Sequence, residues 1–167
     1  RADESCSISY ETKDRDGDGR DDRLARDCQG KLLWWEAYAY DAEGRTVGTR
    51  RYTPTDSVEW TRLYAYEGAH RSLEAFYLPM NDEHELQWYT RRLYDDDNLL
   101  LEANYDDDGT LQWYETREYL ESDLERYYAR FDSAATPVWL YSYAQDDQGR
   151  EILVETYLPE NGAGPSS

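Results

Sequence analysis

The chain has 167 residues, of which 39% are hydrophobic, and its 37 acidic and 18 basic side chains give a formal net charge of −19. This length suits one domain of ordinary size, and so negative a field repels phosphate backbones and anionic lipid, which argues against nucleic acid or an anionic membrane as a partner. No run reaches the roughly 18 apolar residues that a membrane-spanning helix needs.

A first hairpin is predicted over residues 5–30, with the acidic stretch DRDGDGRDD at its turn. Within Asp14–Asp22, aspartates alternate with other residues and Gly19 follows, which matches the start of a calcium-binding loop. Calcium takes about six to eight oxygen ligands, and alternate acids on a tight turn point to one centre. The twelfth place is Ala25 instead of a bidentate glutamate, so we expect a weak Ca²⁺ site, with a solvated acidic turn as the alternative. The predicted ligands are the carboxylates of Asp14, Asp16, Asp18 and Asp22 and the backbone carbonyl of Arg20.

Two cysteines, Cys6 and Cys28, flank this loop. Their positions sum to 34, so a hairpin centred on Gly17 sets them opposite each other, with Ile8 opposite Arg26. A cross-strand disulfide is therefore predicted, and closing a loop of about 20 residues contributes about 3 kcal/mol in the chain-entropy model. Such a bond indicates an oxidising, extracytoplasmic compartment. The alternative is a pair of free thiols in a reducing one.

From residue 32 onward, aromatic residues recur in three columns at a common period. The tryptophans follow one another at intervals of 26, 28, 25 and 26 residues, which predicts about six equivalent units in all. The columns are Trp34, Trp60, Trp88, Trp113 and Trp139; Tyr52, Tyr77, Tyr105, Phe131 and Tyr157; and Tyr40, Tyr66, Tyr94, Tyr119 and Tyr143.

Each unit reads as two β-strands and two turns. Runs such as LLWWEAYAY and LQWYETREY are rich in β-formers, and Asp, Gly and Pro clusters such as DAEG, TPTD and DDDG separate them every 10 to 13 residues. We expect an all-β antiparallel meander over residues 1–158, with 159–167 as a flexible tail. An open, curved and twisted sheet is favoured, and a closed barrel of about twelve strands is the alternative.

The register can be predicted as well. In each unit the tryptophan and its partner aromatic lie 17 or 18 residues apart, which sets them opposite or nearly opposite across the hairpin. On the second strands, small and aliphatic residues precede the terminal aromatic at even spacing, and this face is expected to be the better buried one. It comprises Leu73, Ala75 and Tyr77; Leu101, Ala103 and Tyr105; and Leu153 and Tyr157. The charged residues that share the tryptophan face are expected to snorkel or to pair across strands and not to mark a site; they are Arg62, Arg92, Glu115 and Arg117.

The stretch YAYDAEGR, Tyr38 to Arg45, resembles the RHS/YD repeat, whose core reads Tyr-x-Tyr-Asp-x-x-Gly-Arg. Later units keep fragments of it, and the units are also similar to MORN-type repeats, which are hairpins rich in Trp and Tyr. Both resemblances imply a strip of β-hairpins. Long RHS arrays form shells around toxin cargo, but six units are too few for that, so the resemblance does not imply this function.

No catalytic constellation accompanies the two histidines, and we expect a protein that is not an enzyme. The expected function is binding or structural, as a secreted or cell-surface repeat protein with a protein or carbohydrate ligand. The five column tryptophans are candidate binding aromatics, with a purely structural role for the rings as the alternative. An immunity or antitoxin-like protein for a basic toxin is a second interpretation, and a carbohydrate-binding module is a third. Oligomers formed by edge-strand pairing are also expected, and the acid excess is equally typical of a halophilic source.

Overall fold

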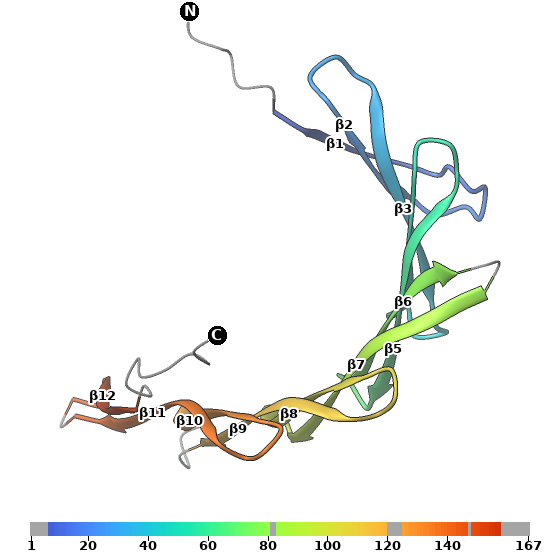
Figure 1. The fold of residues 1–167 in the computed structure, drawn as a ribbon. Helices are drawn as coiled ribbons and strands as arrows, with labels where there is room; N and C mark the ends of the chain where they lie inside the picture. The colour runs from blue at the N-terminus through green and yellow to red at the C-terminus, as the bar shows by residue number, and fades with distance from the viewer. Residues whose placement is uncertain (1–6, 81–82, 120–124, 147, 158–167) are drawn as a thin grey trace, which may run out of the picture. The chain divides into compact units, whose positions relative to one another are not determined.

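The computed structural model describes residues 7–80, 83–119, 125–146 and 148–157. Its regular elements are all β-strands, and they form one sheet in the order β1 to β12, each beside its neighbours in the chain (Figure 1). Because β1 and β12 do not pair, the predicted open antiparallel meander is confirmed over the closed alternative. The strands are β1 (Ser9–Lys13), β2 (Asp22–Arg26), β3 (Leu32–Tyr40), β4 (Thr46–Tyr52), β5 (Val58–Glu67), β6 (His70–Met80), β7 (Glu83–Asp95), β8 (Asn98–Asp106), β9 (Leu111–Tyr119), β10 (Glu125–Asp132), β11 (Pro137–Gln145) and β12 (Glu151–Tyr157).

The described part of the chain contains no helix that is long and apolar enough to cross a membrane. By its internal contacts the chain divides into two compact units. The first unit comprises the residues up to Ala65 together with Glu74–Gln87, and the second comprises Tyr66–Leu73 and the residues from Trp88 onward. Residues 159–167, which were predicted to be a flexible tail, lie outside the described residues.

The recurring turn explains the Tyr-Asp-x-x-Gly-Arg motif. At Asp41 the backbone N–H donates to the carbonyl of Arg45 at 3.0 Å, and the Gly44 N–H donates to the carbonyl of Asp41 at 3.1 Å. The Asp41 carboxylate accepts the N–H groups of Glu43 at 3.1 Å and Arg45 at 2.8 Å, and its second oxygen accepts Arg45 Nε at 2.7 Å. Gly44 has a φ of 81°, which only glycine adopts without strain. The Asp, Gly and Arg of the motif therefore each supply a hydrogen bond or a backbone angle to the turn. The same pair of backbone bonds closes the turns that begin at Asp27, Thr53, Asp106, Asp132 and Asp146.

One of these turns carries alanine at the position where four others carry glycine, and the turn that begins at Thr53 carries Asp56 there. Ala135 has a φ of 61°, a left-handed conformation that costs an L-residue about 1–2 kcal/mol. We therefore expect Ala135→Gly to raise the free energy of unfolding by about 0.5–1 kcal/mol in urea titrations, after the greater flexibility of glycine in the unfolded chain is subtracted. The reverse change at an equivalent place, Gly149→Ala, is the matched control and should lower it, since Gly149 has a φ of 74°. Loss of stability on Ala135→Gly would contradict the turn geometry.

The aromatics of the two columns are nearly opposite each other, with an offset of one residue. Tyr52 faces Trp35, where the spacing set it opposite or nearly opposite Trp34. The cause is a β-bulge in β4. Near the turn Tyr40 pairs with Thr46, as predicted. The next residue of β4, Val47, has no partner on β3, so the register shifts by one residue from there on. Because successive side chains point to opposite faces of a strand, Trp34 and Tyr52 lie on opposite faces of the sheet.

The bulge repeats along the chain, next to the third aromatic column. The register shifts beside Tyr94, Tyr119 and Tyr143 just as it does beside Tyr40. In these four hairpins the residue after the column tryptophan therefore faces the partner aromatic. The observed pairs are Tyr89 with Tyr105, Tyr114 with Phe131, and Leu140 with Tyr157.

Candidate functional site

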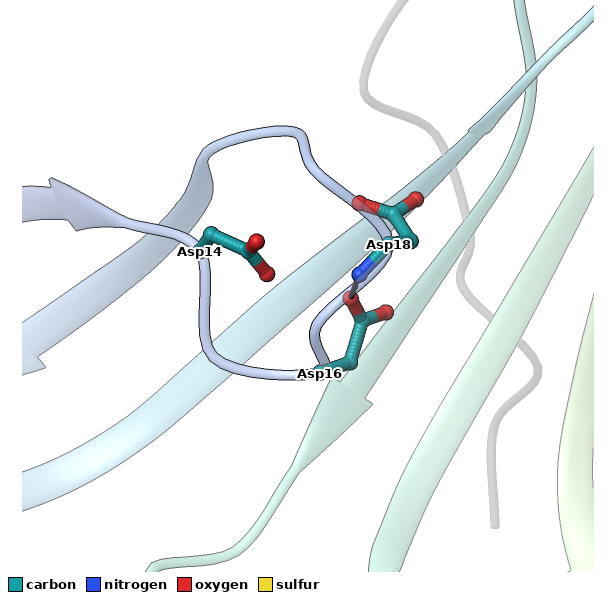
Figure 2. A group of neighbouring side chains, drawn as sticks. All are labelled: Asp14, Asp16 and Asp18. Carbon is teal, nitrogen blue, oxygen red and sulfur yellow. Dashed lines mark hydrogen bonds between the residues drawn. The ribbon is translucent and has the colours of Figure 1, made fainter.

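The predicted calcium loop lies between β1 and β2. Asp14, Asp16 and Asp18 each place a carboxylate oxygen there, and these oxygens lie within 4.8 Å of one another (Figure 2). The alternation of aspartates thus brings three of the four predicted carboxylates together. Oxygen atoms gathered in this way are the type of ligand that a hard cation such as Ca²⁺ prefers.

The loop is shaped by its own carboxylates. Asp14 accepts the backbone N–H of Gly17 at 2.7 Å on one oxygen and that of Gly19 at 3.0 Å on the other. Asp16 accepts the N–H of Asp18 at 3.1 Å, the bond drawn in Figure 2. These local bonds orient the side chains of Asp14 and Asp16, and each bonded oxygen keeps a further lone pair for a cation.

The other two predicted ligands have different surroundings. The Asp22 carboxylate is 3% exposed and accepts the N–H groups of Arg15 at 2.8 Å and Asp16 at 3.2 Å. Burial raises the pKa of Asp22, against the effect of these two bonds. Asp22 is therefore outside the group of three, and it closes the base of the loop. Arg20 donates its backbone N–H to Asp18 at 2.8 Å and lays its guanidinium over the Tyr40 ring, 4.3 Å from the centroid.

The cysteine prediction is tested only in part. Cys6 lies outside the described residues, and Cys28 lies in the turn between β2 and β3, so the disulfide stays a prediction. The register used to derive it is wrong by one residue, because Arg26 pairs with Ser9 and not with Ile8. Eight residues, 14–21, separate the two strands, and an even number puts the hairpin's centre between two residues instead of on one.

The acidic loop is anchored to the sheet by a cluster that the sequence did not indicate. Asp56, in the turn between β4 and β5, accepts Arg15 Nη2 at 2.9 Å and Trp35 Nε1 at 3.0 Å. The Arg15 guanidinium lies 5.1 Å from the centroid of the Trp35 ring, which stacks on Tyr52 with centroids 4.1 Å apart. The side chain of Arg15 thus fixes the loop over one face of the first unit.

Beside this anchor the same face has a hollow of about 280 Å³. Asp16 and Asp18 of the loop line one part of it, and Ala37, Ala39 and Gly48 line another. The hollow therefore combines two carboxylates with small apolar groups from the strands.

On the other face of the first unit, arginine side chains cover the tryptophan rings. The Arg51 guanidinium lies 3.9 Å from the centroid of Trp34 and 5.0 Å from that of Trp60. Its Nη2 is 2.6 Å from Oε1 of Glu36, which is 6% exposed. Tyr38 donates its hydroxyl to Glu36 at 3.0 Å, and burial together with the Glu36 charge raises the pKa of Tyr38 to about 12.

The second unit has a similar arrangement. Glu102 and Glu115 face each other on β8 and β9, and each has an arginine beside it. Arg92 Nε is 2.6 Å from Glu102, and Arg130 Nη1 is 3.4 Å from Glu115. Tyr128 also donates its hydroxyl to Glu115, at 2.8 Å. The 3.4 Å pair of Arg62 on β5 and Glu74 on β6 in the first unit is a further contact between neighbouring strands. These contacts confirm cross-strand pairing for Arg62, Arg92 and Glu115, whereas Arg117 lies 3.7 Å from Glu115 on its own strand, β9.

These contacts bear on the candidate binding aromatics. Trp34, Trp60 and Trp113 each have a guanidinium over the ring, that of Arg130 lying 4.0 Å from the Trp113 centroid. Trp139 packs edge-on against Tyr128, with centroids 4.4 Å apart. Trp60 additionally lies 6.1 Å from Phe76. Ring faces that already carry such neighbours contribute to the sheet itself.

The fold and the loop define a class of protein, an all-β hairpin-repeat protein whose described strands form a single-layered sheet. The chain matches no protein-family model and no curated protein. Among solved structures it is similar to TcdB2-TccC3-TEV, with a TM-score of 0.29 and 12% identity over 87% of this chain and 12% of that chain. It is also similar to a protein with unknown function (BF3112) from Bacteroides fragilis NCTC 9343, with a TM-score of 0.26 and 12% identity over 93% of this chain and 94% of that one. These likenesses are too weak to carry an argument, so the resemblance to YD repeats rests on the motif and its turn.

Proposed function

We propose that this chain is a non-enzymatic repeat protein that binds a basic protein surface. The observation that supports the proposal is the excess of carboxylates, 37 acids against 18 bases, on a sheet whose described strands make up one layer. Described turns such as 27–31 and 106–110 are largely exposed and therefore accessible to a partner. An acidic protein attracts a basic partner over a long range and associates with it quickly.

A protein partner is favoured over a carbohydrate by the contacts of the tryptophans. A sugar ring stacks on an uncovered aromatic face, whereas Arg51 lies over both Trp34 and Trp60. In the second unit Arg130 lies over Trp113 in the same way. Displacing these guanidinium groups costs their interaction with the rings, about 0.5–2 kcal/mol each.

Binding measurements with three probes test the proposal. We expect an oligolysine peptide to bind with an affinity that falls steeply as salt rises, because the attraction is between net charges. An uncharged peptide of equal length and soluble oligosaccharides should not bind. Oligosaccharide binding that quenches tryptophan fluorescence would support the carbohydrate-binding module instead. Failure of all three probes would contradict a binding function of this kind.

Ca²⁺ and a disulfide between Cys6 and Cys28 are proposed to stabilise the first hairpin, as in a secreted, periplasmic or cell-surface protein. Millimolar Ca²⁺ should raise the thermal unfolding temperature, because a cation offsets the repulsion among Asp14, Asp16 and Asp18. Asp14→Asn with Asp16→Asn should remove this rise, and Asp107→Asn with Asp108→Asn is the control of equal charge. Reductant should lower the unfolding temperature of the parent protein. No response to Ca²⁺ would exclude the metal site, and no response to reductant would exclude the disulfide.

An immunity protein would also bind a basic partner, but it would act in a different compartment from a secreted binding protein. The charge of −19 favours it as much as it favours a secreted binder. A disulfide is rare in the reducing cytosol, where an antitoxin would act. Thiol labelling of the protein isolated from its native source separates the two: two reactive thiols favour the immunity protein, and an intact disulfide favours the secreted one.

A further inference from the structure

We propose that the hollow beside the acidic loop is the place where the basic partner inserts a lysine side chain. This inference rests on the proposed function and names the group that the partner contributes. The hollow lies on the face of the first unit that carries the Trp35 and Tyr52 stack, and Tyr52 lines it. Its volume, about 280 Å³, is below the range of about 300–1,000 Å³ that is usual for small-molecule sites and suits a single side chain.

The floor of the hollow matches the alkyl part of a lysine. Ala37 and Ala39 of β3 and Gly48 of β4 present at most a methyl group, and Leu63 of β5 forms an apolar wall that is 45% exposed. An uncovered leucine next to small residues leaves apolar surface in contact with water. A chain of methylene groups laid along it gains about 0.8 kcal/mol for each CH₂ that is buried.

Gly48 of β4 lies next to the bulge residue Val47, and its own backbone and packing leave room for a side chain. It lies inside a strand, where glycine costs roughly 0.5–1 kcal/mol relative to alanine, and its φ is not positive. A Cβ added there would lie 3.5 Å from both Ala39 Cβ and Leu63 Cδ2, which is ordinary van der Waals contact. Neither the backbone nor the packing therefore requires glycine. A glycine within a strand often marks a bulge, such as the one beside Val47, or a place where a ligand or another chain approaches closely.

The charges around the hollow match the ammonium group. Asp16 and Asp18 are exposed at its edge, so a cation can reach their carboxylates. Arg50 also lines the hollow and donates its Nε to Thr61 Oγ1 at 3.3 Å, which leaves two carboxylates against one guanidinium. Long cationic side chains commonly lay their methylene stem on apolar surface and place the charge at its polar edge.

Two peptides of equal charge test the inference. Oligolysine and an oligomer of 2,4-diaminobutyrate carry the same number of amines, but the second has a stem shorter by two methylene groups. Affinities are measured with a chelator present, because Asp16 and Asp18 also belong to the calcium proposal, and at a pH where both amines are protonated. We expect oligolysine to bind about tenfold more tightly or better, since two buried methylene groups correspond to about 1.6 kcal/mol.

Variants then show whether the preference for lysine arises at the hollow. Gly48→Ala should reduce the lysine preference and Gly48→Val should abolish it, while urea unfolding shows that stability is kept or raised. Asp16→Asn with Asp18→Asn keeps the oxygens that accept backbone N–H groups and should weaken oligolysine binding more than Asp107→Asn with Asp108→Asn does. Equal affinity of the two peptides, or a preference unchanged in a folded Gly48→Val protein, would overturn the inference and leave the proposed function standing. If neither peptide binds, the proposed function itself fails.

Discussion

Replacing Trp35 with alanine is expected to lower the free energy of unfolding of the first unit by about 3–5 kcal/mol, the usual cost of removing a buried tryptophan. Trp35 is 5% exposed and stacks on Tyr52, with centroids 4.1 Å apart and planes 9° from parallel. Its Nε1 donates to Asp56 at 3.0 Å, and Arg15 lies over its ring. The change therefore removes packing, a hydrogen bond and the anchor of the acidic loop together.

Urea unfolding and hydrogen exchange measure this effect, and exchange shows where it falls, because repeat sheets open locally. Trp35→Phe keeps a ring for the stack but loses the N–H, so it should cost about 1–2 kcal/mol. Trp34→Ala is the matched control, a neighbouring tryptophan on the opposite face that is only half-buried. If Trp34→Ala lowers the free energy of unfolding more than Trp35→Ala does, the register with the bulge is wrong, and Trp34 is the residue that faces Tyr52.

The strands and turns were predictable because their signals are local. LLWWEAYAY is β3, residue for residue, and LQWYETREY is β9. Aspartate accepts its own turn's N–H groups and glycine supplies the positive φ, so DAEG and DDDG predict turns without any knowledge of the rest of the fold. The period then places these elements in the same order in every unit.

The bulges were not predictable from the period. Near the turn the register is as expected, since Tyr40 pairs with Thr46. Val47 then adds one residue to one strand, and nothing in the alternation of side chains distinguishes an extra valine from a regular one. A shift of one residue exchanges the faces, which is why the tryptophans lie against arginines and not against the partner aromatics.

The burial of side chains was likewise predictable from the sequence only in part. The face expected to be better buried does contain Ala75 at 5% and Ala103 at 3% exposure, but Leu153, expected on the same face, is 55% exposed. Glu36 and Glu115, on the other face, are as well covered at 6% and 7%. A single-layered sheet has no interior, so residues on each face are buried by long side chains that lie along that face. Composition alone does not show which side chains these are. The anchor through Asp56 was equally hidden, because it joins the acidic loop to a turn 41 residues away.

The second large effect on stability is expected from replacing Glu115 in the second unit. Glu115→Ala should lower the free energy of unfolding by about 2–3 kcal/mol, because it leaves partly buried donors without their acceptor. Those donors are the Tyr128 hydroxyl at 2.8 Å and Arg130 Nη1 at 3.4 Å. The cost is below that of a fully buried ion pair, since the Arg130 side chain is 33% exposed.

The matched variant Glu115→Gln separates charge from shape. It keeps an oxygen for Tyr128 and removes the like-charge contact with Glu102 on the next strand, so it should cost about 1 kcal/mol or less. Urea unfolding measured at low and at high salt gives the free energies of unfolding of both variants. Added salt should change the difference between them only slightly, because Glu115 is buried and salt screens buried charges less. If Glu115→Gln is as destabilising as Glu115→Ala, the charge of Glu115 stabilises the unit more than its hydrogen bonds do. If neither change alters stability, Glu115 does not connect β9 to β10 as the structure has it.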